Sequence, residues 1–287
     1  MLNEDLLQIY ADSFRINWEL PALTQYAEGT TMTYGDLARR IARTHMFFSE
    51  CGLKPGQKVA LLGKNSVEWI VIYMATITYG AVIVPILNDF NPIDAQHIIN
   101  HSDSVMLFVN DSIWENLDFD KMTGLKIAMS IDTSEVLAES SSMTGKAKKA
   151  MSVLSKKFSK KYPYGFTAND VRYRFFSPDS LAEINYTSGT TGFSKGVMLT
   201  LNNLCGNVVF GMRSKLHYRG SRALSFLPLA HAYGCAFDML VPLAVGTHVT
   251  VFGKLPSPKL LIKALGEVKP SLILCVPLIL EKIYRSQ

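Results

Sequence analysis

A glycine- and hydroxyl-rich stretch at residues 187–197 carries the residues best suited to chemistry in this chain. It follows an apolar run that ends in Tyr186, reads TSGTTGFSKGV and contains a single cation, Lys195. Glycines let the main chain approach a ligand closely and aim its N–H groups at oxygen atoms. Hydroxyl groups add neutral donors and can bind a magnesium ion, and a lysine ammonium supplies a compact positive charge. The stretch therefore predicts a loop that binds a polyphosphate.

The spacing of this loop differs from that of the Walker loop. A Walker loop has glycine immediately before its lysine and serine or threonine immediately after it, whereas Lys195 lies between Ser194 and Gly196. The alternative for such a composition is an ordinary flexible loop. The density of small and hydroxyl-bearing residues between two expected strands, closed by Lys-Gly, favours the phosphate loop.

A second candidate is His231, in the segment LPLAHAYG. It lies between a strand expected to end near Leu227 and an apolar helix expected at residues 235–245. Such a histidine is either a core residue bonded to the backbone or a group that faces a ligand. Taken alone, the segment favours the core interpretation.

The elements that must position these residues alternate between strands and helices. Thr33 and Asp36 have the spacing of a capping box at the start of a helix that ends near residue 52. Asn65 and Glu68 repeat this spacing before a second, apolar helix. Strands are expected at residues 59–62, 81–85, 105–109, 125–131 and 183–186, and a third helix after Asn91. This order predicts an α/β fold with a parallel or mixed sheet and helices on both faces, which binds ligands at the carboxyl ends of its strands.

Residues 69–88 contain no charged side chain and approach the length of a membrane-spanning helix. Thr76, Thr78, Gly80 and Pro85 interrupt the apolar run near the point where a helix would turn into a strand. A buried helix followed by a buried parallel strand therefore explains the run better than a transmembrane segment does.

Composition and charge exclude several classes of protein. The 287 residues are 48% apolar and 18% charged, as in globular chains and unlike disordered or collagen-like ones. The net charge of +5 is local, because seven lysines lie between residues 146 and 161 and no Asp or Glu occurs from 140 to 169. The net charge of the remaining residues is near zero, so no nucleic-acid partner is expected. Four separated cysteines and no signal peptide at the N-terminus predict reduced thiols, no zinc site and a cytoplasmic location.

The lysine-rich connector at about residues 139–164 contains an amphipathic helix. Ala147, Met151, Leu154, Phe158 and Tyr162 fall on one helical face, and most of the lysines fall on the other. Either the helix packs its apolar face on its own domain, or residues 146–161 make a peripheral contact with an anionic membrane. The small size of the apolar face favours packing within the domain.

The motif YTSGTTG followed by KGV resembles the phosphate-loop signature of the AMP-forming adenylating enzymes, which include acyl-CoA synthetases, luciferases and peptide-synthetase adenylation domains. Thr33-Tyr34, Gly80-Ala81-Val82 and LPLAH followed by Gly246 occur in the order that the family shows. Ser194 stands where the family usually has proline, which removes no phosphate ligand. The resemblance covers most of the chain, and residues 270–285 look most like the long-chain fatty acyl-CoA ligases. It implies the N-terminal part of the adenylating-enzyme fold.

The resemblance also implies a reaction. A substrate carboxylate, from a fatty acid or another acid, attacks the α-phosphate of ATP, pyrophosphate leaves, and the thiol of coenzyme A then displaces AMP. The implied pyrophosphate contacts are Thr187, Ser188, Gly189, Thr190, Thr191, Gly192 and Lys195, with the Thr190 hydroxyl near Mg²⁺. The resemblance places His231 beside the acyl carboxylate as an orienting group, against the core interpretation. The oligomeric state stays open.

Finally, the resemblance suggests how the chain is divided. Residues 1–219 are expected to form an N-terminal α/β region with the phosphate loop, and residues 220–287 to begin a second, truncated α/β subdomain. The family's adenine-binding segment, ribose-binding aspartate and late catalytic lysine are not found after Lys195, so an N-terminal portion that does not turn over by itself is expected. Two other functions stay open: adenylation of an aromatic or amino acid, and a scaffold that keeps the fold without the chemistry.

Overall fold

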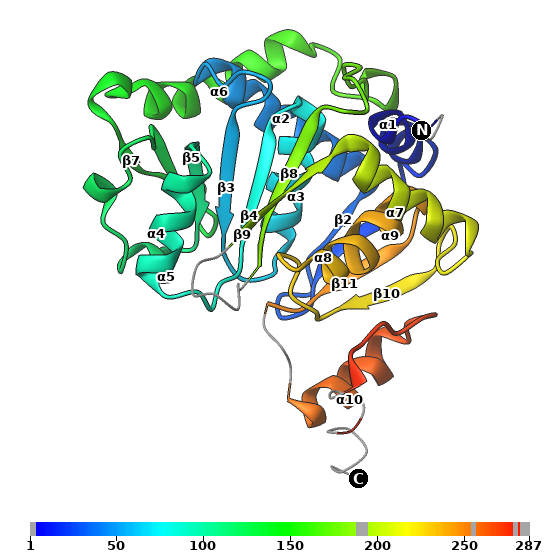
Figure 1. Ribbon diagram of the computed structural model, residues 1–287. Helices are drawn as coiled ribbons and strands as arrows, with labels where there is room; N and C mark the ends of the chain where they lie inside the picture. Colours follow the sequence, from blue (N-terminus) through cyan, green and yellow to red (C-terminus); the bar gives the residue numbers. More distant parts are fainter. Residues whose placement is uncertain (1–3, 188–194, 254–256, 278–280, 282–287) are drawn as a thin grey trace.

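Two sheets with covering helices form the body of the molecule (Figure 1). The structure, a computed structural model, describes residues 4–187, 195–253, 257–277 and 281. The helices are α1 (Leu6–Ile16), α2 (Tyr34–Glu50), α3 (Val67–Tyr79), α4 (Pro92–His101), α5 (Asp111–Trp114), α6 (Lys146–Lys161), α7 (Leu201–Arg213), α8 (Ala232–Gly234), the π-helix η4 (Cys235–Leu240), α9 (Val241–Val245) and α10 (Pro258–Val268). The strands are β1 (Pro21–Gln25), β2 (Thr31–Thr33), β3 (Lys58–Leu62), β4 (Val82–Ile86), β5 (Ser104–Val109), β6 (Ile127–Ser130), β7 (Val136–Glu139), β8 (Leu181–Thr187), β9 (Lys195–Thr200), β10 (Arg222–Ser225) and β11 (His248–Val251).

The larger sheet is parallel in its centre and antiparallel at both edges. Within the described residues its strand order is β7-β6-β5-β3-β4-β8-β9. The pairs from β6 to β8 are parallel, and β7 and β9 each pair antiparallel with their neighbours. The expected α/β fold with a mixed sheet is therefore confirmed. The carboxyl ends of the central strands meet at one edge, where parallel sheets bind ligands.

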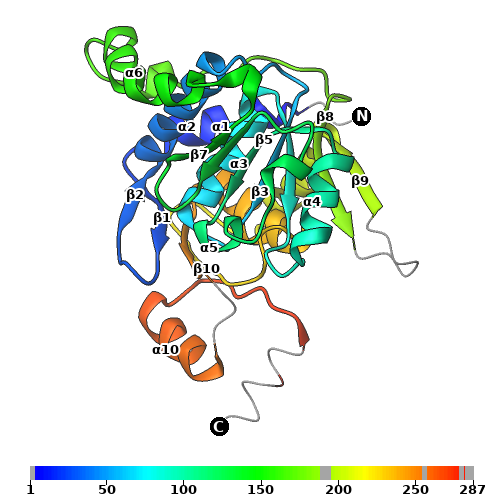
Figure 2. The same ribbon diagram turned by 90° about the vertical axis from the view of Figure 1, so that its left-hand side faces the viewer.

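Helices cover both faces of this sheet. Figure 2 shows α4 and α5 on the side that faces the viewer, and the main hydrophobic core packs α2 and α3 against the other side. Eleven of the thirteen residues of α3 are buried, and Gly80 ends the helix in a left-handed conformation. Burial on all sides explains the charge-free run at residues 69–88. Within the described ranges, no helix combines the length and the apolar character needed to cross a bilayer.

Two of the three expected helix starts are confirmed. Thr33 and Asp36 form a reciprocal capping box, and Asn91 caps α4 with Pro92 in its first turn. The expected pair of Asn65 and Glu68 is wrong. The cap of α3 is Ser66, whose side chain accepts the backbone N–H of Trp69. Asn65 instead reaches a distant segment of the chain, and Glu68 pairs with Arg40.

The second sheet joins distant parts of the chain. Its order is β10-β11-β1-β2, and β1 pairs in parallel with β11 more than 220 residues away, for example Leu23 with Val249. Helix α1 and strands β1 and β2 were not among the elements expected from the sequence. Strands from both sides of residue 219 thus share one sheet, and the division at that residue stays a prediction.

Helix α6 packs its apolar side on α2. Ala147, Ala150, Leu154 and Phe158 are buried, and the guanidinium of Arg43 lies 5.5 Å from the centre of the Phe158 ring. This is the arrangement that the sequence favoured. The lysines of α6 are exposed, so a contact with an anionic membrane through residues 146–161 stays a prediction.

Candidate functional site

The phosphate-loop motif connects the two strands of a hairpin at the edge of the larger sheet. Strands β8 and β9 pair antiparallel, and Thr187, the last residue of β8, is opposite Lys195, the first residue of β9. Both side chains are exposed. The other expected phosphate contacts lie outside the described residues: Ser188, Gly189, Thr190, Thr191 and Gly192. The structure therefore brings together the two ends of the predicted site.

Tyr186 anchors one face of this hairpin. Its hydroxyl lies 2.8 Å from Nδ1 of His101 at the end of α4, and the two rings meet edge to face. Its cross-strand partner is Gly196, where a Cβ atom would come within 3.1 Å of the Tyr186 ring. A side chain at this position would need the Tyr186 ring to shift by a few tenths of an ångström, because the ring covers that part of β9. The hairpin is thus held against α4 one residue before the loop begins.

Asn185 links the opposite face of β8 to the segment that carries His231. Its side-chain amide donates to the carbonyl of Ala230 at 3.3 Å and to the Glu183 carboxylate at 2.9 Å. The hydroxyl of Tyr73, on α3, donates to the other oxygen of Glu183. Burial raises the pKa of Glu183, and the hydrogen bonds from Tyr73 and Asn185 oppose that shift. This buried cluster connects the phosphate-loop strand to the residue before His231.

Asn65 holds the same segment from the end of β3. Its amide donates to the carbonyl of Leu227 at 2.7 Å, and its side-chain oxygen accepts the N–H of Leu229 at 3.0 Å. The two bonds fix the backbone on both sides of Pro228, much as a neighbouring strand would. The spacing of Asn65 and Glu68 predicted a helix cap, whereas the structure gives Asn65 this bridging role.

Asp238 supports the segment from the π-helix η4. The carboxylate is 4% exposed and accepts the N–H of Leu227 at 3.4 Å. Burial raises the pKa of Asp238 to about 7, although hydrogen bonds from the backbone of Leu227 and Phe226 oppose the shift. Gly234 lies so close to the segment that a Cβ atom would be 2.4 Å from the carbonyl oxygen of Pro228. Bonds from three elements and one close backbone approach therefore define the path that leads to His231.

His231 is exposed at the start of α8 and is not a core residue. Its Nδ1 accepts the N–H of Tyr233 at 3.4 Å, and its carbonyl accepts the N–H of Cys235 at 2.9 Å. When Nδ1 accepts this bond, Nε2 is the ring nitrogen that can carry a proton. The Nε2–H group can then donate to an acceptor outside the chain, such as a carboxylate oxygen.

A polar cavity of about 500 Å³ lies at the carboxyl ends of β3, β5 and β6. Asn65 lines it together with Lys64, Asn110 and Asp132. The Asn110 amide donates to Asp132, and its oxygen accepts the N–H of Lys64 at 2.8 Å. This edge therefore offers both space for a ligand and fixed polar groups. In the part of the chain that the structure describes, no three His, Cys, Asp or Glu residues cluster as metal ligands.

Sequence reasoning found Thr187, Lys195 and His231 but missed the residues that position them, Asn185 and Asn65. Asn185 carried one usable signal. It is a polar residue in an apolar strand immediately before the loop, and such a residue must find a partner when it is buried. Asn65 also occurs in the order of residues that the family shows, but no local pattern indicated its bonding partners, which lie 162 and 164 residues away.

Known proteins are similar to this chain over most of its length. The family model described as AMP-binding enzyme matches residues 15–287. A long-chain-fatty-acid–CoA ligase of Mycobacterium bovis, FadD15, is 28% identical over 260 residues, which cover 90% of this chain and 40% of that protein. The chain thus spans about two fifths of that relative's length.

Two solved structures have the same fold. A long-chain-fatty-acid-CoA ligase (FadD1) from Archaeoglobus fulgidus matches with a TM-score of 0.80 at 18% identity, covering 99% of this chain and 54% of that one. ATP-bound MatB from Rhodopseudomonas palustris matches with a TM-score of 0.75 at 21% identity, covering 96% of this chain and 50% of that one.

Proposed function

Because the chain belongs to the AMP-binding enzyme family, we propose that it supplies the phosphate loop and the acyl-carboxylate side of an ATP-dependent fatty acid–CoA ligase. The name of the relative from Mycobacterium bovis supports a fatty acid as the substrate, and the ATP-bound solved structure supports ATP. The relative is longer than this chain, so the activity is proposed for the complete gene product.

The observation that carries the proposal is the link between β8 and the His231 segment. Asn185 lies two residues before Thr187 and bonds to Ala230, the neighbour of His231. The group proposed to bind phosphate and the segment proposed to bind carboxylate are therefore linked through one strand. Transfer of an adenylyl group to a carboxylate needs both reactants positioned together, and positioning supplies much of the rate enhancement in such reactions.

The proposed reaction has two steps. A carboxylate oxygen of the fatty acid attacks the α-phosphorus of ATP, and the bond from that phosphorus to the bridging oxygen breaks as pyrophosphate leaves. The sulfur of coenzyme A, after losing its proton, then attacks the acyl carbon, and the bond to the AMP oxygen breaks. Thr187 and Lys195 are suited to contact the leaving pyrophosphate. The Thr187 hydroxyl can donate a hydrogen bond to a phosphate oxygen, and Lys195 carries a positive charge.

The hydroxyl of Thr187 at the base of the hairpin is also suited to a magnesium ion that the phosphates of ATP would carry. Exposed hydroxyl oxygens are ligands that Mg²⁺ accepts, and Thr190 stays the proposed contact. When bound, Mg²⁺ would neutralise charge on the phosphate oxygens. His231 would orient the substrate carboxylate by donating its Nε2 proton as a hydrogen bond. This role needs no change in the charge of the ring.

Two alternatives are weaker. Amino-acid adenylation would need an acid that faces the substrate ammonium, and the nearby candidate, Asp238, is buried and accepts a backbone N–H. A non-catalytic scaffold would have no use for an exposed lysine opposite a threonine at the base of a glycine-rich loop.

Carboxylate-dependent exchange of pyrophosphate into ATP, measured with the complete gene product, tests the proposal. We expect exchange with palmitate, weaker exchange with benzoate and none with leucine. Exchange that responds to leucine alone would replace the fatty-acid assignment with an amino-acid one. No exchange with any acid, despite retained ATP binding, would favour the scaffold. The same assay on residues 1–287 tests the expectation that they do not turn over alone.

A further inference from the structure

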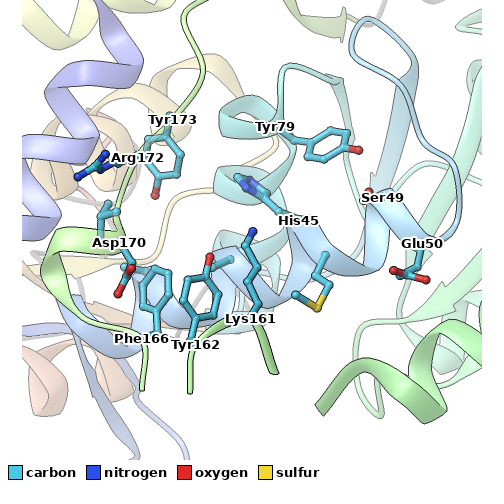
Figure 3. A pocket seen from close by; sticks show the side chains of 14 residues that line it. His45, Ser49, Glu50, Tyr79, Lys161, Tyr162, Phe166, Asp170, Arg172 and Tyr173 are labelled. Carbon is cyan, nitrogen blue, oxygen red and sulfur yellow. The ribbon is translucent and has the colours of Figure 1, made fainter. Parts of the chain in front are cut away.

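A second cavity, of about 370 Å³, lies beside α2 (Figure 3). It is lined by α2 from Ala38 to Glu50, by Tyr79 at the end of α3, and by residues between Lys161, the last residue of α6, and Tyr173. Tyr79 comes three residues before β4 begins, so this cavity lies at the amino ends of the parallel strands. Parallel sheets bind their substrates at the carboxyl ends, so the proposed reaction makes no use of this cavity.

The walls of the cavity combine polar groups with an apolar and aromatic part. Helix α2 contributes Ala38, Ala42 and Met46, and the segment after α6 contributes Tyr162 and Phe166. The rings of Tyr162 and Phe166 are 5.0 Å apart and nearly perpendicular. Such walls suit a flat, apolar ligand, because aromatic rings pack edge to face or offset against one another. The volume is within the range of small-molecule sites.

Three hydrogen-bond donors converge on this space. Figure 3 shows Nζ of Lys161 and the hydroxyls of Tyr162 and Tyr173 pointing towards the space beside His45. The Tyr173 hydroxyl is inaccessible to solvent and has no hydrogen-bond partner among the described residues. A buried donor without a partner is rare in folded proteins, because it loses its bonds to water and gains none.

The acids around the cavity are already engaged. Asp170 accepts the N–H and the hydroxyl of Thr167, both at 2.8 Å, and these bonds help to lower its pKa. Glu50 pairs with Lys157. No described carboxylate lies within ion-pair distance of Lys161, which stands at the exposed mouth of the cavity.

His45 is uncharged and fixed in place. Its Nε2 lies 3.0 Å from the carbonyl oxygen of Ala75, so that nitrogen must donate. Burial, and to a smaller extent the charge on Lys161, lowers the pKa of His45 to about 4. The positive charge that points into the cavity therefore comes from Lys161.

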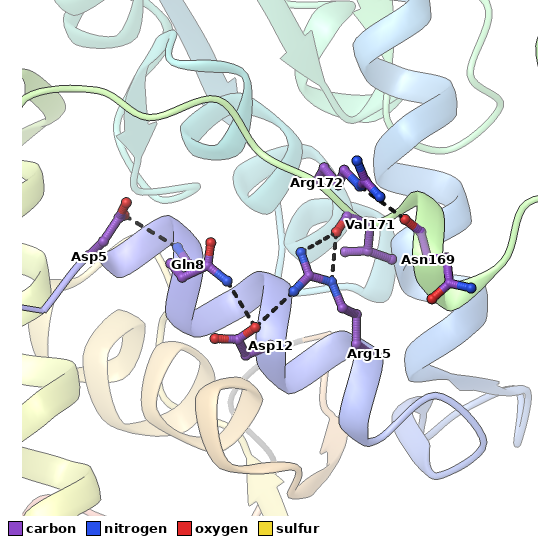
Figure 4. A network of polar contacts seen from close by, with 7 residues as sticks. All are labelled: Asp5, Gln8, Asp12, Arg15, Asn169, Val171 and Arg172. Atoms are coloured by element: carbon purple, nitrogen blue, oxygen red, sulfur yellow. Dashed lines mark hydrogen bonds and ion pairs between the residues drawn. The ribbon is translucent and has the colours of Figure 1, made fainter.

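The wall formed by residues 169–172 is held from outside by α1 (Figure 4). The guanidinium of Arg15 donates twice to the carbonyl of Val171, at 2.9 and 2.7 Å, and pairs with Asp12. Arg172 donates to the carbonyl of Asn169, and its side chain points away from the cavity in Figure 3. This wall of the cavity is thus held in place, which reduces the entropy lost when a ligand binds.

We propose that this cavity is a binding site for a planar organic anion, an aromatic carboxylate, separate from the phosphate-loop site. The carboxylate would accept from Lys161 and from the hydroxyls of Tyr162 and Tyr173, and the ring would pack between α2 and Phe166. The proposal does not depend on the proposed ligase function.

Calorimetric titration of the chain with 2-naphthoate tests this site, with the neutral 2-naphthalenemethanol and inorganic phosphate as comparisons. We expect saturable binding of 2-naphthoate, binding of the alcohol that is weaker by about tenfold or more, and none of phosphate. Saturating pyrophosphate should leave the affinity for 2-naphthoate unchanged. Equal binding of the alcohol and the acid would overturn the proposal, because the donors would then play no part.

Three variants locate the site. Tyr173→Phe should weaken 2-naphthoate binding by about tenfold, and Lys161→Met by about fivefold. The control Lys160→Met, on the same helix but outside the cavity, should bind as the unaltered chain does. Tyr173→Phe removes only a hydroxyl without a partner, so its melting temperature without ligand should not fall. Unchanged affinity in both Tyr173→Phe and Lys161→Met would place the bound acid elsewhere and refute this site.

Discussion

Thr187 and Lys195 are cross-strand partners at the base of the hairpin that carries the phosphate-loop motif. Directly opposed residues of an antiparallel pair have Cα atoms about 5 Å apart, so a hydroxyl and an ammonium separated by seven residues lie on adjacent strands. In the proposed function, this pairing would allow Lys195 to contact the same phosphate group as the hydroxyl of Thr187.

Replacement of Lys195 should therefore affect ligand binding and not folding. Lys195 is exposed and takes part in no ion pair within the described part of the chain. We expect Lys195→Ala to weaken pyrophosphate binding about tenfold, since a charge-assisted contact is lost. Calorimetry measures the affinity, with the exposed Lys156→Ala as control. Equal affinities for the two variants would contradict the role of Lys195.

The variant Asn65→Asp tests whether the side chain of Asn65 bridges two segments of the chain or caps helix α3. Asparagine and aspartate are equivalent as N-caps, so a capping role predicts no loss of stability. In the structure, Asn65 must donate to the carbonyl of Leu227, and aspartate would place a negative charge against that oxygen. We expect Asn65→Asp to lower the free energy of unfolding by about 1–3 kcal/mol, measured by urea denaturation. The variant Ser66→Asp keeps the observed helix cap, so it should change the free energy of unfolding by less than about 0.5 kcal/mol.

Asp238 should make stability depend on pH. Its pKa is about 7 in the folded chain and near 3.8 when unfolded, so folding favours the protonated carboxyl. The protonated carboxyl of Asp238 therefore contributes fully to the stability of the fold below about pH 4, and this stabilisation is lost as the pH rises towards 7. Asp238→Asn cannot titrate, so the stability of the unaltered chain relative to this variant should fall by roughly 2–3 kcal/mol between pH 5 and pH 8. The exposed Asp179→Asn is the control, and a constant difference across this range would show that Asp238 does not titrate as described.

Gly234 should not tolerate even a methyl group. A Cβ atom there would be 2.4 Å from the Pro228 carbonyl oxygen, and the backbone of the His231 segment would have to move. We expect Gly234→Ala to cost about 2 kcal/mol and to reduce pyrophosphate exchange in the complete gene product. Gly266→Ala, within α10 and facing open space, should instead stabilise the chain by about 0.4–1 kcal/mol. Thermal unfolding compares the two, and a neutral Gly234→Ala would mean that the segment has room to adjust.

Much of the larger sheet was predictable because its signals are local. The capping box of Thr33 and Asp36 spans three residues, and the apolar runs that became β3, β4, β5 and β8 appear within windows of four to seven residues. The loop motif is equally local, since a turn that approaches phosphate needs glycines and hydroxyls in sequence. Helix α6 was predicted with its apolar face for the same reason.

The second sheet and the supports of the site were not predictable in this way. Strand β1 has five residues and its parallel partner β11 lies more than 220 residues away, so no local pattern records the pairing. The spacing of Asn65 matched a cap, yet its two bonding partners come from the loop after β10. The burial of Asp238 depends equally on elements that are distant in the chain.

The loop motif in the sequence was enough to predict the family, and hydrophobic periodicity was enough to predict the alternation of strands and helices. Both signals lie in residues a few positions apart in the chain. Only the tertiary structure decided that Asn185 connects the phosphate-loop strand to Ala230, and that Tyr173 and Lys161 converge on a separate cavity. The reason is physical: a buried polar group bonds to whatever packing places beside it, and packing brings together residues that are far apart in the chain.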